Sequence, residues 1–407
     1  MQANRTRKKH RRKKRSKNKI SQDLQEKLKK YFGYETFRPG QQEIVESILQ
    51  GKNVLAVMPT GGGKSICYQL PGLLMPGLIL VVSPLISLMK DQVEALQKLG
   101  IRAEHLDSSM SFYEQNIVLN LVLTGECKIL YVSPERLQSQ EFQQFAQKVH
   151  ISLLAVDEAH CVSQWGRSFR KEYYEIPLFV AKLTQKPILT AFTATATPQV
   201  RQDILQHLGM RNAKVFVHGF DRPNLQFAVK RTGNKNLAVM EFLAKHKGQS
   251  GIIYCSTREQ VRELHKTLQR GGVVSCRYHG GLTPLERQNN QNAFLENRSP
   301  VIVATNAFGM GIDKKDVRFV LHYNLPLTVE GYYQEAGRAG RDGGSADCVL
   351  LYNPMDIDIC DYLIHEGETD SEIIKMEQEL LKEMVRYTGA KDFRRFILEY
   401  FGEGEDN

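Results

Sequence analysis

Short apolar runs recur along this chain, and a polar or glycine-rich turn closes each of them. Segments of about 10–20 residues with helical periodicity separate the runs. Strands that helices cover on both faces read as continuous apolar stretches, and parallel strands need crossover connections between them. The alternation therefore predicts an α/β fold built on parallel sheets. The first series of runs comprises residues 54–58, 78–82, 128–132, 153–156 and 188–192.

A second series with the same rhythm begins after the segment Phe220-Asp221-Arg222-Pro223-Asn224. Its runs comprise residues 251–255, 273–278, 301–305, 318–322 and 348–352. We therefore predict two tandem domains, over residues 21–218 and 219–353, and a helical segment over residues 354–407. The facing strand ends of two such sheets form a cleft, which is a common location for a ligand.

Positive charge is concentrated at the amino terminus. Residues 1–20 hold eleven of the 55 Lys and Arg residues and no acid, which leaves 44 basic against 45 acidic residues in the rest of the chain. Such a run repels itself, and it is typical of a disordered tail that binds polyanions. A merely solubilising extension is the alternative.

Membrane-spanning proteins and zinc-binding proteins do not fit this sequence. No apolar stretch approaches the roughly 18 residues of a membrane helix. The seven cysteines are scattered and contain no CxxC pair, so we expect buried thiols in a reducing compartment and no zinc.

Residues 58–65, with the sequence Met-Pro-Thr-Gly-Gly-Gly-Lys-Ser, join the first apolar run to a helical pattern. Glycines let backbone N–H groups wrap a phosphate chain at the N-terminus of a helix. Lys64 would reach the β- and γ-phosphates, and the Ser65 hydroxyl would bind Mg²⁺. The generic motif has glycine where this chain has Met58. The candidate nucleotide-binding residues of this loop are Thr60, Gly61, Gly62, Gly63, Lys64 and Ser65.

Two adjacent carboxylates, Asp157 and Glu158, follow the apolar run at residues 153–156. Open α/β sheets bind ligands at the carboxyl ends of their strands, so Asp157 can hold Mg²⁺ while Glu158 polarises the attacking water. Taken alone, the pair could instead cap a helix. The phosphate loop upstream, which also follows a strand, favours the catalytic interpretation.

Three further segments carry groups suited to the same chemistry. Residues 165–170 hold aromatic and basic side chains, which stack on bases and bind phosphates. Residues 193–197, Thr-Ala-Thr-Ala-Thr, suit a relay at the end of another strand, or they form a plain threonine-rich turn. Arg338 and Arg341 are three residues apart on one helical face, so both can approach one phosphate chain as arginine fingers.

Together these segments resemble the RecQ family of superfamily-two DNA helicases. The resemblance runs from about Tyr31 to Glu403, and the W-G-containing loop after D-E-A-H distinguishes this family from other helicases. It implies two tandem RecA-like P-loop domains. The motifs that carry it, in the family's order, are F-G-Y-E-T-F-R-P-G-Q, P-T-G-G-G-K-S, S-P-L-I-S-L-M-K-D-Q, D-E-A-H-C-V-S-Q-W-G, F-G-M-G-I-D-K and Q-E-A-G-R-A-G-R-D-G.

The resemblance also implies roles for single residues. Tyr34, Arg38 and Gln41 would hold adenine, and Asp313 would lie near the ribose. The loop that contains Trp165, Phe169 and Arg170 would sense single-stranded DNA and signal to the ATP site. The candidate catalytic residues are Lys64, Asp157, Glu158, His160, Gln334, Arg338 and Arg341, and the candidate DNA-binding residues are Ser83, Lys90, Trp165, Arg167, Phe169, Arg170 and Asn306.

The chain departs from the family's pattern at two places. Arg167 stands where members usually carry histidine, and a permanent cation there is expected to alter the coupling of DNA binding to hydrolysis. Phe393 stands where the first cysteine of the family's zinc-binding domain is expected, and the sequence ends before the others. We therefore expect a minimal or truncated member that lacks the zinc-binding cysteines and the winged-helix domain.

The resemblance implies an ATP- and Mg²⁺-dependent DNA helicase of recombination and repair, which moves 3′ to 5′ if the family rule holds. The alternatives are a translocase that is stimulated by single-stranded DNA but unwinds little, and a catalytically weak nucleic-acid-binding adaptor. The expected partners are single-stranded and forked DNA, with no membrane, and the expected state is a monomer. A nucleoid-associated protein of the cytoplasm is expected, with the nucleus as the alternative because the basic run could serve as an import signal.

Overall fold

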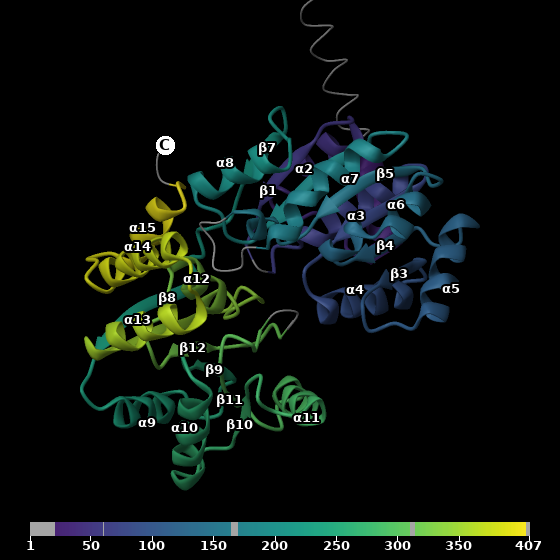
Figure 1. Cartoon of the computed structure of the whole chain (residues 1–407). Helices are drawn as coiled ribbons and strands as arrows, with labels where there is room; N and C mark the ends of the chain where they lie inside the picture. The colour runs from purple at the N-terminus through teal and green to yellow at the C-terminus, as the bar shows by residue number, and fades with distance from the viewer. Residues whose placement is uncertain (1–20, 60, 164–169, 310–313, 404–407) are drawn as a thin grey trace, which may run out of the picture.

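The computed structural model describes residues 21–59, 61–163, 170–309 and 314–403, which form two lobes joined in tandem (Figure 1). Each lobe is built on one sheet in which every strand pair is parallel. The prediction of an α/β fold with two parallel-sheet, RecA-like domains is confirmed.

The first sheet has seven strands in the order β3-β4-β2-β5-β6-β1-β7. One strand, β6, separates the strand that leads into the phosphate loop (β1) from the strand that leads into Asp157 (β5). Their carboxyl ends therefore lie at one edge of the sheet. The strands are β1 (Val54–Val57), β2 (Leu78–Val82), β3 (Ala103–Leu106), β4 (Ile129–Val132), β5 (Ile151–Val156), β6 (Ile188–Thr193) and β7 (Lys214–Val217).

Helices cover both faces of the first sheet, which explains why β1, β2, β4 and β5 are buried along their whole length. One face packs against a helix over residues 21–32, α2 (Gln41–Leu49), α3 (Lys64–Leu74) and α4 (Ile86–Lys98). The other face packs against α5 (Phe112–Leu123), α6 (Gln140–Ala146), α7 (Ile176–Lys182) and α8 (Pro198–His207). Three short 3₁₀ turns are η1 (Pro134–Gln138), η2 (Ala159–Val162) and η3 (Lys171–Glu175).

The second sheet has six strands in the order β10-β11-β9-β12-β13-β8. Its strands are β8 (Leu225–Arg231), β9 (Gly251–Tyr254), β10 (Ser275–Tyr278), β11 (Val301–Ala304), β12 (Phe319–His322) and β13 (Ala346–Tyr352). One face packs against α9 (Lys235–Lys245) and α10 (Arg258–Arg270). The other packs against α11 (Pro284–Leu295), α12 (Val329–Ala336), α13 (Met355–Gly367) and α14 (Ser371–Thr388).

The chain after β13 is helical, as predicted, and ends in α15 (Phe393–Tyr400). Figure 1 shows α14 and α15 against the second lobe, on the side that faces α8 of the first. A hydrogen bond joins the two lobes there, because the Arg201 guanidinium in α8 donates to the Phe401 carbonyl at 3.3 Å. The C-terminal segment therefore touches both lobes.

The apolar runs correctly predicted the central strands and the outer strand β10, but they missed β3, β7 and β8. Two of these are outer strands of the first sheet and the third is an outer strand of the second. Half-exposed Glu104 and His105 interrupt β3, and exposed residues alternate with less exposed ones along β8. Edge strands face solvent on one side, so they lack the continuous apolar run that marks a buried strand.

Two composition-based expectations can be compared with the structure. None of the helices in the described part of the chain is long and apolar enough to cross a membrane. All seven cysteines are buried with free thiols, as predicted, and burial raises the pKa of Cys161 to about 12.

Candidate active site

The phosphate loop leaves β1 and enters α3, whose first residue is Lys64. Gly61 and Gly63 both have positive φ angles, of 80° and 79°, which only glycine adopts readily. The first turn of α3 contains no acidic residue, so the partial positive charge of the helix N-terminus faces the loop uncompensated. This geometry suits the binding of a phosphate chain.

Gln41, the first residue of α2, and Arg38, just before the helix, hold the phosphate loop. The Gln41 amide donates to the carbonyls of Gly62 at 3.2 Å and Gly63 at 3.0 Å, and its oxygen accepts the Arg38 N–H at 2.8 Å. Arg38 also donates from its guanidinium to the Gly61 carbonyl. The two residues predicted to hold adenine thus contact the loop itself, while Tyr34 is 51% exposed at the rim.

Asp157 is buried at the end of β5, where its N–H donates to the Val82 carbonyl at 2.8 Å. One of its carboxylate oxygens accepts the Glu158 N–H at 3.0 Å. Burial and the neighbouring Glu158 carboxylate raise the pKa of Asp157 to about 7, against the opposing effect of Lys64. A cation beside this pair of carboxylates is therefore favoured electrostatically.

Glu158 has a left-handed backbone conformation, with φ and ψ both 47°. Among the described residues, only Asn297 shares a positive φ angle without being glycine. Non-glycine residues in this region cost about 1–3 kcal/mol and concentrate at functional sites. The strained turn lies where β5 ends, and Glu158 lines the cavity between the lobes.

His160 lies between Glu158 and the end of the neighbouring strand β6. Its Nδ1 atom is 3.3 Å from Oε2 of Glu158 and 2.9 Å from the hydroxyl of Thr193. The Thr193 hydroxyl in turn donates to the Thr195 carbonyl at 3.1 Å. Burial lowers the pKa of His160, so its ring is neutral at neutral pH. Hydrogen bonds thus link His160 to the threonine-rich turn, and the same ring nitrogen faces the Glu158 carboxylate.

The candidate arginine fingers come from the second lobe, but both lie in the turn after α12 ends at Ala336, so the prediction that they share a helical face is wrong. Arg338 is buried and donates to the Gly309 carbonyl. Arg341 reaches the phosphate loop of the first lobe, because a Cβ atom on Gly61 would lie only 3.3 Å from its Cδ atom. The second lobe therefore contributes an arginine directly at the phosphate loop.

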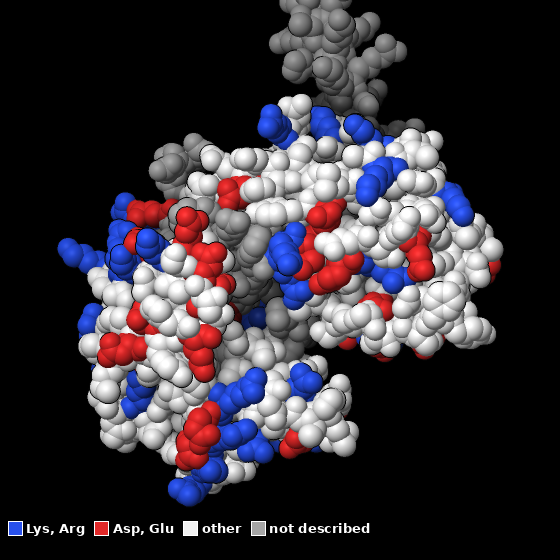
Figure 2. Space-filling model, in the orientation of Figure 1, with Lys and Arg blue, Asp and Glu red and all other residues white. Residues whose placement is uncertain are grey.

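A cavity of about 620 Å³ unites these groups between the lobes. The predicted residues that line it are Tyr34, Arg38, Gln41, Gly61, Gly63, Lys64, Ser65, Asp157, Glu158, Gln334, Arg338 and Arg341. Space-filling Figure 2 shows the molecule hollowed between the lobes, with basic and acidic side chains along the rim. The arrangement can hold a nucleotide between a phosphate loop, two carboxylates and two arginines.

The predicted DNA-binding residues that the structure describes differ in how far they are exposed to solvent. Ser83 is only 1% exposed, so its hydroxyl does not face solvent in this conformation. Lys90 is about half exposed and lies 3.7 Å from the Asp107 carboxylate, and Arg170 lies 3.5 Å from Glu135. Asn306 is exposed and lines a second cavity of about 480 Å³, which His160, Thr195 and Gln334 also line.

Several predicted site residues lie outside the described residues: Thr60, Trp165, Arg167, Phe169 and Asp313. The structure does describe both ends of the segment that holds three of them. The Ser163 hydroxyl donates to Asp203 at 2.6 Å, and the Arg170 N–H donates to the Cys161 carbonyl at 2.9 Å. Both attachments lie close to the turn that carries Glu158.

Sequence reasoning missed some residues that contact the site. Lys315 of the second lobe also lines the 620 Å³ cavity, and the Tyr173 hydroxyl donates to the Asp157 carbonyl at 3.1 Å. The segment at residues 218–224, which the sequence marks only as a domain boundary, contacts both lobes, since the His218 N–H donates to the Val57 carbonyl and Arg222 donates to the Gly340 carbonyl.

Two parallel sheets in tandem, with a nucleotide-sized cavity between a phosphate loop and facing arginines, define a helicase-type P-loop protein. Family comparison agrees: residues 38–204 match the "DEAD/DEAH box helicase" model and residues 234–343 match the "Helicase conserved C-terminal domain" model. Among solved structures, the DUF1998 helicase MrfA bound to DNA has a TM-score of 0.70 over 94% of this chain and 61% of its own, at 20% identity.

Sequence relatives identify the family. The ATP-dependent DNA helicase RecQ of Bacillus subtilis is 46% identical over 93% of this chain, which spans 64% of that relative. The probable ATP-dependent DNA helicase RecS of the same organism is 42% identical over 94% of this chain, which spans 77% of it. The chain belongs to the RecQ family of DNA helicases.

Proposed function

We propose that this chain hydrolyses ATP to move along single-stranded DNA and to unwind duplex DNA. The observation that carries the proposal is the position of Arg341, which reaches from the second lobe to Gly61 of the phosphate loop. Arg341 lines the 620 Å³ cavity together with Lys64, Asp157 and Glu158. A nucleotide in that cavity would touch both lobes, so its hydrolysis would change how they are held together.

The donor set fits Mg²⁺, since Ser65 and Asp157 offer a hydroxyl and a buried carboxylate to the same cavity. When bound there, Mg²⁺ would neutralise charge on the β- and γ-phosphates. Lys64 would bind those phosphates, and Glu158 would accept the proton of the attacking water. Arg338 and Arg341 would stabilise the charge that develops on the transferred phosphoryl group.

DNA would reach this chemistry through the turn that follows Asp157. Support comes from His160, whose Nδ1 atom contacts both the Glu158 carboxylate and the Thr193 hydroxyl, and from the second cavity that His160 shares with Asn306. A strand that contacts Asn306 and the segment over residues 164–170 would bias these contacts. Thus the position of Glu158 would depend on DNA, which is what a DNA-stimulated ATPase requires.

The relatives act on DNA according to their names, and we extend this to the present chain as part of the proposal. The basic tail over residues 1–20 would add sequence-independent affinity for phosphates. We further propose a monomer that acts on forked and single-stranded DNA in the cytoplasm. Movement from 3′ to 5′ and a role in recombination and repair also belong to this proposal.

ATP turnover with and without single-stranded DNA tests the motor, and a Lys64→Ala variant serves as the inactive reference. We expect turnover that requires Mg²⁺, rises with DNA and is lost in the variant. Turnover that DNA does not change, or that survives without Lys64, would contradict the proposal and favour an adaptor.

A forked-duplex unwinding assay then separates a helicase from a translocase. The translocase alternative has a specific basis, because Phe393 stands where the first zinc-binding cysteine of the family is expected. Strand separation that is much slower than ATP turnover would favour translocation with weak unwinding.

A further inference from the structure

We propose that Arg222 is a positioning residue that sets the arginine finger Arg341 against the phosphate loop. It acts from the interlobe segment, which we define as residues 218–224. This inference deepens the proposed function and rests on it, because it assigns Arg341 to ATP hydrolysis. Arg222 itself would touch neither nucleotide nor DNA.

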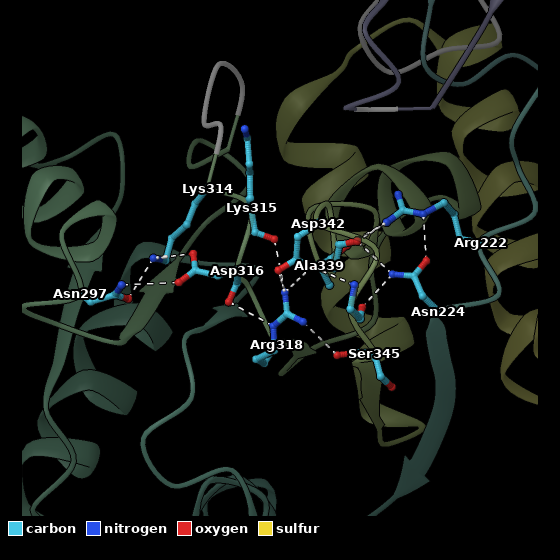
Figure 3. Close-up of polar contacts among 12 residues, drawn as sticks. Arg222, Asn224, Asn297, Lys314, Lys315, Asp316, Arg318, Ala339, Asp342 and Ser345 are labelled. Carbon is cyan, nitrogen blue, oxygen red and sulfur yellow. Dashed lines mark hydrogen bonds and ion pairs between the residues drawn. The ribbon is translucent and has the colours of Figure 1, made fainter. Parts of the chain in front are cut away.

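Arg222 and Asn224 bind the backbone that leads directly into Arg341 (Figure 3). The Arg222 guanidinium donates to the carbonyls of Ala339 at 3.1 Å and Gly340 at 3.0 Å, and also to the Asn224 side-chain oxygen at 3.3 Å. The Asn224 amide donates to the carbonyls of Gly340 and Gly344, both at 2.9 Å. The residue before the finger is therefore held by two side chains.

Gly340 can accept this arrangement only as glycine. Its φ angle is +56°, and a Cβ atom there would collide with the Asn224 amide and lie 2.6 Å from the Gly344 carbonyl. The Gly340 N–H donates to the Val317 carbonyl at 2.9 Å, so both polar groups of its backbone are occupied. The turn before Arg341 thus has very little freedom to rotate.

Arg318 secures the other side of the same turn (Figure 3). Its guanidinium donates to both carboxylate oxygens of Asp342 at 2.6 Å. It also donates to the carbonyls of Lys315, Asp316 and Ser345, at 3.2–3.4 Å. Arg341 therefore lies between Gly340, which Arg222 holds, and Asp342, which Arg318 holds.

The interlobe segment also touches the phosphate loop and its support in the first lobe. The His218 N–H donates to the Val57 carbonyl at 3.0 Å, which extends β7 alongside β1. A Cβ atom on Gly219 would lie 2.8 Å from Cδ of Pro59, and one on Gly40 would lie 2.7 Å from the His218 ring. One short segment thus connects the base of the phosphate loop to the turn that carries Arg341.

Helix α15 and the residues after it fix the middle of the interlobe segment. Phe401 stacks on Phe220 with ring centroids 4.2 Å apart and ring planes 5° apart, and the Tyr333 hydroxyl donates to the Phe220 carbonyl at 2.8 Å. Arg394 pairs with Asp221, and the Glu403 carboxylate accepts the Gly219 N–H at 3.2 Å. The segment is packed on both sides, so a displacement at one of its ends moves the other end instead of bending the segment.

A simpler explanation of the Arg222 hydrogen bonds is that they only stabilise the fold. Lys128 provides a matched comparison, because its ammonium also donates to two backbone carbonyls, those of Met75 at 2.6 Å and Gly77 at 2.5 Å. Lys128 sits at the amino end of β4, opposite the edge where the phosphate loop and carboxylates lie. If Arg222 served only to stabilise the fold, replacing Arg222 and replacing Lys128 would therefore have similar effects.

The test compares Arg222→Met, Arg222→Lys and Lys128→Met in the full chain, alone and combined with Arg341→Ala. Four quantities are measured: kcat and KM for ATP with single-stranded DNA, affinity for a fluorescent ADP, and Tm. Misplacing a catalytic group by about 1 Å can cost on the order of 10²-fold in rate. We expect Arg222→Met to lower kcat about 10- to 100-fold with ADP affinity nearly unchanged, Arg222→Lys to recover part of the loss, and Lys128→Met to keep kcat.

The combination with Arg341→Ala decides whether Arg222 acts through the finger. If it does, Arg222→Met adds little to the loss already caused by Arg341→Ala. The same fold loss in both backgrounds, or an Arg222→Met variant with normal kcat, overturns the inference while the proposed function stands. An unchanged chain that shows no DNA-stimulated turnover overturns the proposed function and this inference together.

Discussion

The hydroxyl of Thr193 lies 2.9 Å from Nδ1 of His160, and it also accepts the Thr195 N–H at 3.3 Å. Because the hydroxyl gives its own hydrogen to the Thr195 carbonyl, the ring proton belongs on Nδ1 of a neutral imidazole. The same Nδ1 faces the Glu158 carboxylate at 3.3 Å. His160 therefore ties the position of Glu158 to the end of β6.

Replacing Thr193 with valine should weaken this tie without removing any catalytic group. We expect DNA-stimulated kcat to fall roughly 2- to 30-fold, the usual range for residues that couple two sites, with little change in KM for ATP. The control is Thr190→Val in the same strand, since the Thr190 hydroxyl is also buried and donates to a backbone carbonyl. Equal losses in the two variants would assign the effect to the fold rather than to coupling.

The central strands and the phosphate loop could be predicted because their signals are local. A strand buried on both faces is a continuous apolar run, and a phosphate loop needs its glycines next to one another. The meeting of Arg341 with Gly61 is different, since these residues are far apart in sequence and only the packing of two lobes unites them. The spacing of Arg338 and Arg341 predicted only that both can approach one phosphate chain, and it did not place Arg341 at Gly61.

The role of the interlobe segment could not be read from its residues. Arg222 and Asn224 bind backbone carbonyls, which every residue type offers, so their partners at Gly340 and Gly344 leave no trace in the sequence. The edge strand β8 was also not predicted, because its residues alternate in exposure and form no apolar run. Long-range backbone contacts are the part of this molecule that sequence patterns do not encode.

A Glu158→Gln variant should separate nucleotide binding from hydrolysis. The amide keeps the size of the side chain but cannot accept a proton from water, and loss of a general base typically costs about 10²- to 10⁴-fold in rate. We expect that loss in kcat, with nucleotide affinity and Tm close to those of the unchanged chain. Glu126→Gln, at an exposed turn after α5, is the charge-matched control. Retained turnover in Glu158→Gln would remove Glu158 from its proposed role.

Gln41 should matter for ATP binding because it holds two carbonyls of the phosphate loop. Removing both hydrogen bonds with Gln41→Ala leaves buried carbonyls without these donors, at a cost of about 1–3 kcal/mol. We expect KM for ATP to rise about 10-fold, while kcat at saturating ATP changes less. Its neighbour Gln42 instead bonds Ser21 and Glu46, so Gln42→Ala should leave KM unchanged. A fluorescent-nucleotide titration distinguishes the two variants directly.

Glu330 in α12 makes stability depend on pH at the junction with α15. Burial raises the pKa of Glu330 above its usual value, and the hydrogen bond that Tyr400 donates to it at 2.7 Å opposes this only in part. A carboxyl whose pKa is raised in the folded state favours folding while it is protonated. That contribution is fully present below the ordinary glutamate pKa of about 4.3 and is lost as the pH rises through the folded value.

Glu330→Gln should therefore stabilise the chain at pH 8, by on the order of 1 kcal/mol, because the amide still accepts from Tyr400 but carries no buried charge. The gain should shrink as the pH falls towards 4.5, where the carboxyl of the unchanged chain is protonated. Urea unfolding of both chains at pH 8, 6.5 and 5 measures this difference. Glu383→Gln in α14 is the comparison, since Glu383 pairs with the exposed side chain of Arg386 and its replacement removes no buried charge. A gain that stays constant across this pH range would show that the ionisation of Glu330 is not its cause.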